Sequence, residues 1–117
     1  MDLQVKITKI EFDKAQTVHR YYMTSKVADV VIELPKTFRK FKTGAEGKIS
    51  LLTSENVGEA CENGIFLHGR VLSLQDENKK AILSFGGLIA LITMKSGDLS
   101  AISEGLSVYL CITGFET

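Results

Sequence analysis

Several kinds of residue and segment are scarce in this sequence, and each scarcity narrows the class of protein. There is a single proline, Pro35, and no apolar run approaches the ~20 residues of a membrane span. The first residues, Met1-Asp2-Leu3-Gln4, lack the charge-then-apolar order of a signal peptide. Shares of 44% hydrophobic and 24% charged residues are typical of a packed globular chain and not of a disordered one. We therefore expect an intracellular protein with one domain over residues 1–117 and no membrane partner.

The chain also carries no net charge at pH 7. The chain has 14 basic and 14 acidic residues, which argues against a protein held to nucleic acid mainly by charge. The charges are unevenly distributed, because residues 1–50 carry ten Lys and Arg against six Asp and Glu, whereas residues 51–117 carry four against eight. Net charges of +4 and −4 in the two parts predict faces of opposite sign.

The two cysteines, Cys61 and Cys111, match neither a zinc spacing nor a redox pair. We therefore do not expect a disulfide framework. Cys111 lies in the apolar stretch Val108–Ile112 and is expected to be a small buried hydrophobic residue.

The residues that catalysis requires are not arranged for it. There are two histidines, His19 and His68, with no metal spacing, nucleophile elbow or phosphate-binding lysine motif. The pair Gly86-Gly87 lacks the third glycine and following helix of a phosphate cradle. We expect no catalytic residues, metal, cofactor or small-molecule substrate, and we expect His68 to be a structural or surface residue.

Short segments with the pattern of β-strands dominate the chain. The first part, up to Pro35, has an alternating segment from Val5, a second from Val18 to Met23 and a β-branched third over Val27–Leu34. Lys48–Leu52 is a fourth. Later segments follow at Ile65–Gln75, Lys80–Phe85, Leu88–Thr93 and Ser107–Thr113.

These segments predict an all-β domain: a small antiparallel barrel of the oligonucleotide-binding (OB) type with seven to eight strands and little helix. A β-sandwich is the alternative. Residues 54–64 are the least strand-like, and we interpret them as a loop with room for a short helix. In Ile65–Gln75 the apolar residues change parity near Gly69, which indicates a bend or bulge there.

The pentapeptide Ser84-Phe85-Gly86-Gly87-Leu88 lies between two apolar runs. Two glycines there allow a two-residue hairpin turn, with Phe85 and Leu88 as a cross-strand pair. They also allow another chain to approach closely. Leu88–Ile92 is apolar without interruption and would need cover on both faces of a sheet. The sequence therefore predicts a partner-binding site, formed by Phe85, Gly86, Gly87, Leu88 and Ile89.

A basic segment, Lys36–Lys42, is the candidate for nucleic-acid contact. It places four cations, Lys36, Arg39, Lys40 and Lys42, around the two rings of Phe38 and Phe41. Cations and rings so arranged can pair with phosphates and stack on unpaired bases. The alternative is a solvated edge, with Phe38 and Phe41 turned into the core.

The second half of the chain resembles a known family. Ser84–Leu88 is followed by aliphatic residues, a polar break containing Leu99 and Ile102, and then Val108–Leu110. Upstream, Ile65–Leu72 resembles an aromatic-rich strand with a glycine in the same place relative to the pentapeptide. In order and spacing, residues 65–113 are similar to the small eighth subunit of multisubunit DNA-directed RNA polymerases, a family with eukaryotic and archaeal members.

The resemblance implies an OB-type barrel without catalytic residues that docks on the largest polymerase subunit and supports transcription. Eukaryotic members have an aromatic residue about where His68 stands, a basic one about where Leu91 stands, and a longer polar insertion in the middle. These differences favour an archaeal-type member, cytoplasmic rather than nuclear. The resemblance does not imply that this chain itself binds DNA, and any direct contact with nucleic acid is expected to be weak. A free-standing single-strand-binding OB protein is the alternative function.

Overall fold

The computed structural model of the chain describes residues 1–53, 61 and 64–115. Within these residues the chain forms eight β-strands, so the prediction of an all-β domain with seven to eight strands is confirmed. The strands are β1 (Asp2–Asp13), β2 (Val18–Thr24), β3 (Ala28–Pro35), β4 (Glu46–Leu52), β5 (Ile65–Gln75), β6 (Lys80–Phe85), β7 (Leu88–Met94) and β8 (Ser107–Thr113). This part of the chain has no helix that is long and apolar enough to cross a membrane.

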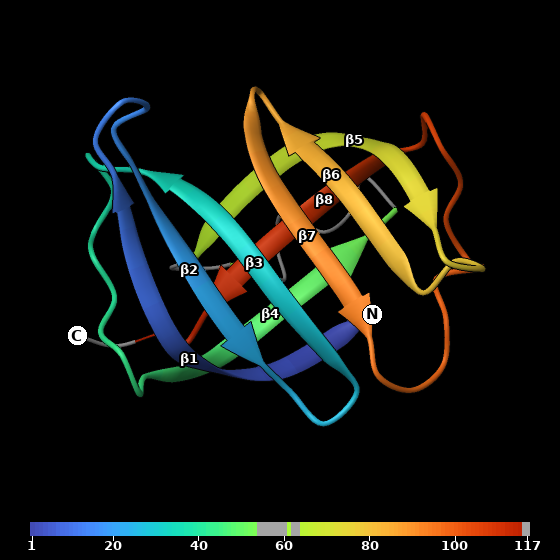
Figure 1. The fold of residues 1–117 in the computed structure, drawn as a ribbon, viewed down its shortest axis with the longest axis horizontal. Coiled ribbons are helices and arrows are strands. Elements are labelled where there is room, and N and C mark those ends of the chain that lie inside the picture. The colour runs from blue at the N-terminus through green and yellow to red at the C-terminus, as the bar shows by residue number, and fades with distance from the viewer. Residues whose placement is uncertain (54–60, 62–63, 116–117) are drawn as a thin grey trace.

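The strands form one closed antiparallel barrel rather than a sandwich (Figure 1). Around the barrel the order is β1, β2, β3, β7, β6, β5, β8 and β4, and β4 pairs with β1 to complete the ring. Small closed antiparallel barrels include the predicted OB type. Because each strand is hydrogen-bonded on both sides, the sheet has no open edge.

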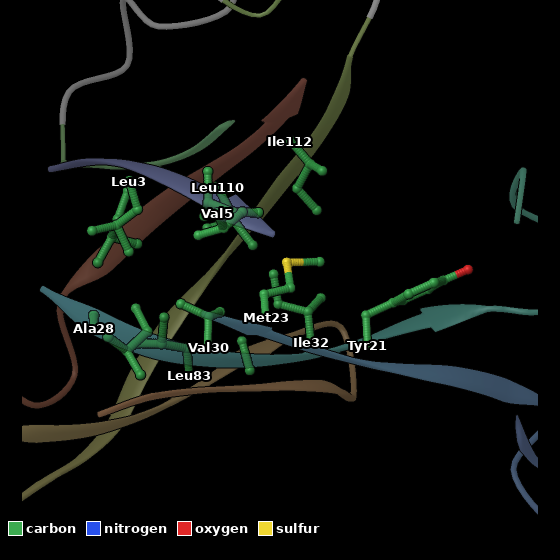
Figure 2. Close-up of a cluster of buried hydrophobic side chains, with 14 of the residues drawn as sticks. Leu3, Val5, Tyr21, Met23, Ala28, Val30, Ile32, Leu83, Leu110 and Ile112 are labelled. Atoms are coloured by element: carbon green, nitrogen blue, oxygen red, sulfur yellow. The ribbon is translucent and has the colours of Figure 1, made fainter. Parts of the chain in front are cut away.

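The core fills the inside of this ring. In β1 the buried residues Leu3, Val5 and Ile7 alternate with exposed ones, as expected for a strand with one face inside. Side chains from both halves of the chain converge in the interior, where Val30 and Ile32 of β3 lie among residues of β1, β2, β6 and β8 (Figure 2).

One end of the barrel is closed by the connection between β3 and β4. Because β3 and β4 are separated by β2 and β1 in the ring, residues 36–45 must pass across the end near the β1–β2 hairpin (Figure 1). Phe41 in this connection is buried, with its ring 5.2 Å from that of Tyr21 and 4.9 Å from that of Phe115. Its backbone N–H donates to the Tyr21 hydroxyl at 3.2 Å. The connection is therefore part of the core at this end.

The double-glycine turn, Gly86-Gly87, joins β6 to β7 as a tight hairpin. The two φ angles are +64° and +96°, a region that favours glycine. Phe85 and Leu88 face each other across the turn, as predicted. The hairpin interpretation of the two glycines is confirmed.

The bulge in β5 lies at Leu72, slightly beyond the predicted position near Gly69. Pairing with β6 shifts between Val71 and Ser73, and Leu72 is left outside with 54% of its surface exposed. Gly69 is required for another reason. A Cβ there would overlap the carbonyl oxygen of Ser84 and touch the ring of Phe85, so β5 and β6 can approach each other only because Gly69 has no side chain.

The expectation that the chain lacks a disulfide is wrong. Cys61 and Cys111 are bonded, with their Cα atoms 5.7 Å apart. Cys111 is buried, as expected, and pairs across the strands with Phe66 near the start of β5, a few residues after Cys61. That antiparallel register, and not the spacing of 50 residues, brings the two sulfurs together. Apart from Cys61 and Gly64, the predicted loop over 54–64 lies outside the described residues.

Replacing Gly69 with alanine should cost far more stability than replacing Gly86. We expect Gly69→Ala to lower the free energy of unfolding by about 3 kcal/mol or more, because the carbonyl of Ser84 cannot move without breaking the β5–β6 ladder. Gly86→Ala has open space and meets only the strain of a positive φ, about 1 kcal/mol. Urea denaturation of both variants measures the difference, and equal costs would contradict the close approach.

Loss of the disulfide should also weaken the fold. A cross-link spanning 50 residues restricts the unfolded chain, so we expect Cys61→Ser to lower the free energy of unfolding by about 2–4 kcal/mol. Reductant should bring the wild type to the same stability and leave the variant unchanged. If iodoacetamide labels both cysteines of the native protein without reductant, the disulfide is absent in solution.

Candidate functional site

An apolar surface lies on the outside of the barrel, next to the double-glycine turn. Val31 of β3, Leu91 of β7 and Ile82 of β6 are direct cross-strand neighbours. Their strand neighbours in the sequence point inward and are buried, so these three side chains point outward, together with Ile89 of β7. We call Val31, Ile82, Ile89 and Leu91 the outer apolar face. All four remain partly exposed to solvent.

Part of this face is the floor of a hollow of about 330 Å³. Val31, Ile89 and Leu91 supply the apolar surface, and Tyr22, Arg20 and Glu33 surround it. The hollow therefore combines an apolar floor with polar groups at its border, which is the composition of many protein–protein contact sites.

A buried carboxylate fixes the hairpin beside this hollow. Glu33 is only 8% exposed, and one of its oxygens accepts from the backbone N–H of Ile89 at 3.0 Å. The other oxygen accepts from Arg20 at 2.7 Å, and the Arg20 guanidinium lies 3.4 Å from Asp13. The carboxylate thus satisfies the N–H of Ile89 just beyond the last paired residues of β3 and β7, Ile32 and Ala90. It thereby fastens the start of β7 to β2 and β3.

A second hollow, of about 320 Å³, lies on the other side of the double-glycine turn. It is lined by Ser84 and Gly86 of the hairpin, together with His68, Gly69, Arg70 and Leu72 of β5. The turn therefore separates two shallow depressions, one bordered by the outer apolar face and one by β5.

Three aromatic rings, two exposed and one partly buried, continue this surface onto β5 and β8. Tyr109 of β8 is stacked against His68 at 4.6 Å and against Phe66 at 5.5 Å between ring centroids. Phe66 is 41% exposed, and His68 is a surface residue. We call these three rings the aromatic stack. Exposed aromatic surface of this kind is enriched where proteins contact one another.

The predicted partner-binding residues are therefore not equivalent. Phe85 is buried in the core at 4% exposure, and Leu88 also packs against the core. Gly86 and Gly87 are exposed in the turn, and Ile89 belongs to the outer apolar face. A partner at this place would contact Gly86, Gly87 and Ile89, while Phe85 supports them from inside.

The basic segment divides in a similar way. Lys36, Arg39, Lys40 and Lys42 are exposed, as nucleic-acid contact would require, whereas Phe41 is buried. Phe38 is half-buried against the core. The two rings turn inward, so this segment presents cations and no stacking surface of its own.

A different aromatic ring stands beside those cations. Phe12 and His19 pair across β1 and β2 at the end of the hairpin, and nearly half of the Phe12 surface is exposed. They line a cleft of about 590 Å³ that also contains two lysines of the basic segment. We call this cleft, formed by Ile10, Phe12, His19, Lys40, Phe41, Lys42 and Thr43, the barrel-end cleft.

Sequence reasoning missed Val31 and Ile82 of the outer apolar face and Phe12 and His19 of the cleft, and it included Leu91 only as part of the apolar run Leu88–Ile92. For β7 a signal was present, because Ile89 and Leu91 alternate with Ala90 and Ile92 and so share one face. For Phe12 and His19 the signal is the hairpin register, which requires the turn at residues 14–17 to be recognised first.

The chain matches none of the protein-family models and none of the curated protein sequences against which it was compared. In the part that the structure describes, no group of three or more His, Cys, Asp and Glu side chains is placed to hold a metal ion.

Removing the Glu33 carboxylate should release the start of β7. Glu33→Ala leaves the Ile89 N–H and the Arg20 guanidinium without this acceptor, so we expect a loss of about 1–3 kcal/mol in the free energy of unfolding. Hydrogen exchange of the Ile89 amide should accelerate more than that of Ile92. Asp29→Ala is the matched control, because it removes an exposed carboxylate of the same strand; an equal effect of the two changes would contradict this role of Glu33.

Proposed function

We propose that this chain is a non-catalytic subunit of a multisubunit DNA-directed RNA polymerase. In this role it docks on the largest subunit of the enzyme and supports transcription by holding part of that subunit in place. The proposal combines the family resemblance of residues 65–113 with the surface around the double-glycine turn. The single observation that carries the docking role is the outer apolar face, where four aliphatic side chains from three adjacent strands point away from the core.

The four aliphatic side chains on the outer wall of the barrel are not explained by packing of the core. The interior is already filled by the inward residues, so the outward ones add nothing to the core. Isolated apolar residues on a surface are common, but contiguous ones bordered by polar groups are typical of contact sites. In the outer apolar face, Val31, Leu91 and Ile82 are contiguous, and Arg20 and Glu33 border them. This arrangement supports the proposal that the outer apolar face binds another protein.

The way the partner is held follows from the closed sheet. With all strands paired on both sides, a partner segment cannot join as an additional strand, and it must instead contact side chains. The absence of side chains at Gly86 and Gly87 allows the partner's backbone to approach the turn closely, between the two hollows. A stable complex buries roughly 800 Å² of surface on each partner. This area is larger than the surface that lines either hollow. The interface is therefore expected to extend from the outer apolar face across the turn to Leu72 and the aromatic stack.

Replacing Ile89 and Leu91 with serine should prevent assembly without unfolding the barrel. Both side chains are partly exposed and lie outside the core, so we expect the barrel to remain folded, with a smaller loss of stability than a core truncation causes. Truncating central apolar contacts costs an interface more than about 1 kcal/mol each, so the double variant should associate at least tenfold less with the polymerase. Val27→Ser, which removes an exposed apolar side chain from the β2–β3 turn, is the matched control.

The measurement is affinity purification of the tagged chain from cells that produce it naturally. The largest polymerase subunit is identified by mass spectrometry, and the complex is sized by gel filtration. Wild type and Val27→Ser should elute with the polymerase, whereas Ile89→Ser/Leu91→Ser should elute as a small free protein. If the wild type elutes without the polymerase, or if the double variant assembles normally, the proposal is wrong.

A further inference from the structure

We propose that the barrel-end cleft binds single-stranded nucleic acid, with a base stacked on Phe12 and the backbone phosphates paired with Lys36, Lys40 and Lys42. This site lies on elements that form no part of the outer apolar face, since it is built from the β1–β2 hairpin and the connection between β3 and β4. It does not depend on the proposed polymerase role.

The shape and lining of the cleft suit a nucleotide. Its volume of about 590 Å³ is within the range of ~300–1,000 Å³ found for ligand sites. Its apolar and aromatic lining comes from Ile10, Phe12 and Phe41, and its cations are Lys40 and Lys42. None of the residues that line it is acidic. An anionic ligand with a flat apolar part satisfies both kinds of surface.

Phe12 is the only exposed ring among the cleft residues. It pairs with His19 across the hairpin, with the two rings 5.2 Å apart, yet 47% of its surface is open. The Nζ of Lys36 lies 5.7 Å from the centre of the Phe12 ring. OB folds bind single strands with exposed aromatic rings, on which bases stack, in a positively charged groove that follows the backbone.

The lysines have the freedom to bind phosphate. Among the described residues, Lys36, Lys40 and Lys42 take part in no ion pair, whereas Lys9, Lys48 and Lys95 do. Neighbouring cations that lack carboxylate partners repel one another, and phosphates relieve that repulsion. Three phosphate contacts give an affinity that falls with salt, with a slope of about −2 in log K against log salt concentration for a single strand.

His19 provides a polar group for the edge of a base. Its Nδ1 is buried and has no hydrogen-bond partner among the described residues. Burial lowers the pKa of His19, and the charges of Lys40 and Lys36 lower it further, so the neutral ring is favoured near pH 7. A neutral imidazole has one nitrogen that accepts and one that donates. Because Nδ1 is enclosed, Nε2 is the candidate to pair with the edge of a base or with a sugar hydroxyl.

The exposed ring of Phe12 also favours single-stranded over double-stranded nucleic acid. The bases of a duplex are stacked on each other, so only an unpaired base can place its face against Phe12. A chain of acidic residues alone, such as polyglutamate, could satisfy the lysines but has no flat group to stack on the ring. Single-stranded nucleic acid is the ligand that uses both.

The test is fluorescence anisotropy of the whole chain with a labelled oligothymidine of about 12 nucleotides, which is within the span that one OB fold covers. We expect a dissociation constant of roughly 10–100 µM at about 50 mM NaCl. Phe12→Ala should weaken binding at least fivefold, because stacking contributes about 1–3 kcal/mol per base. Lys40→Ser/Lys42→Ser should reduce the salt slope in magnitude by about 1.4.

The matched control is Lys6→Ser/Lys26→Ser, which removes the same charge from exposed positions near the β2–β3 turn, away from the cleft. It should leave affinity nearly unchanged. Thermal unfolding of each variant confirms that the barrel is intact, and Phe12 is exposed enough for its removal to be tolerated.

Four outcomes overturn the site. The first is the absence of binding at about 50 mM NaCl. The second is equal weakening by the cleft and control lysine variants, which indicates attraction without a site. The third is a Phe12→Ala variant that binds as well as wild type. The fourth is binding of duplex DNA or polyglutamate as tight as that of the single strand. Because the oligonucleotide assay uses the isolated chain, its result stands whether or not the chain enters a polymerase.

Discussion

Closure of the β-sheet is the constraint on which the rest of the structure depends. Pairing of β4 with β1 completes a ring in which each strand has two neighbours, so the backbone polar groups of the wall are largely used within the sheet. Recognition is therefore left to side chains on the outer wall and to the ends of the barrel. The two candidate sites lie in these places: the outer apolar face on β3, β6 and β7, and the cleft at the end crossed by the β3–β4 connection.

Local sequence was sufficient to predict most of the strands and the class of fold. Alternation identified β1, β-branched residues identified β3, and the paired glycines identified the β6–β7 hairpin together with its Phe85–Leu88 pair. These features depend on neighbours in the chain. The ring order, in which β3 lies beside β7 and β8 lies between β5 and β4, depends on pairings between distant segments and could not be predicted locally.

The disulfide and the position of the bulge were also beyond prediction from local sequence, because both depend on how two strands pair. Nothing in the spacing of Cys61 and Cys111 reveals that Cys111 pairs with Phe66, and this register is what brings the sulfurs together. The parity change in β5 was visible, but its position at Leu72 depends on how β5 pairs with β6. A pattern in one strand indicates that a bulge exists, whereas the partner strand decides where it lies.

The candidate sites were predicted in part. Gly86, Gly87 and Ile89 are accessible where a partner was predicted, but the parity of β6 places Phe85 with Leu83 inside the barrel. In the basic segment the four cations are exposed, while the rings of Phe38 and Phe41 belong to the core side. The ring that accompanies those cations, Phe12, comes from a strand more than twenty residues earlier in the sequence. Only the hairpin register and the crossing connection bring it there.

The position of β8 also has a consequence for how the protein folds. Of the eight described strands β8 is synthesised last, yet it lies between β5 and β4, and β4 in turn pairs with β1. The hairpins β1–β2–β3 and β5–β6–β7 can form as the chain emerges from the ribosome, but the ring cannot be completed until translation has passed Thr113. Barrels dominated by such non-local pairings fold in milliseconds to seconds rather than microseconds. Until then β4 and β5 each have an open edge, and the nascent chain is most exposed to aggregation during this interval.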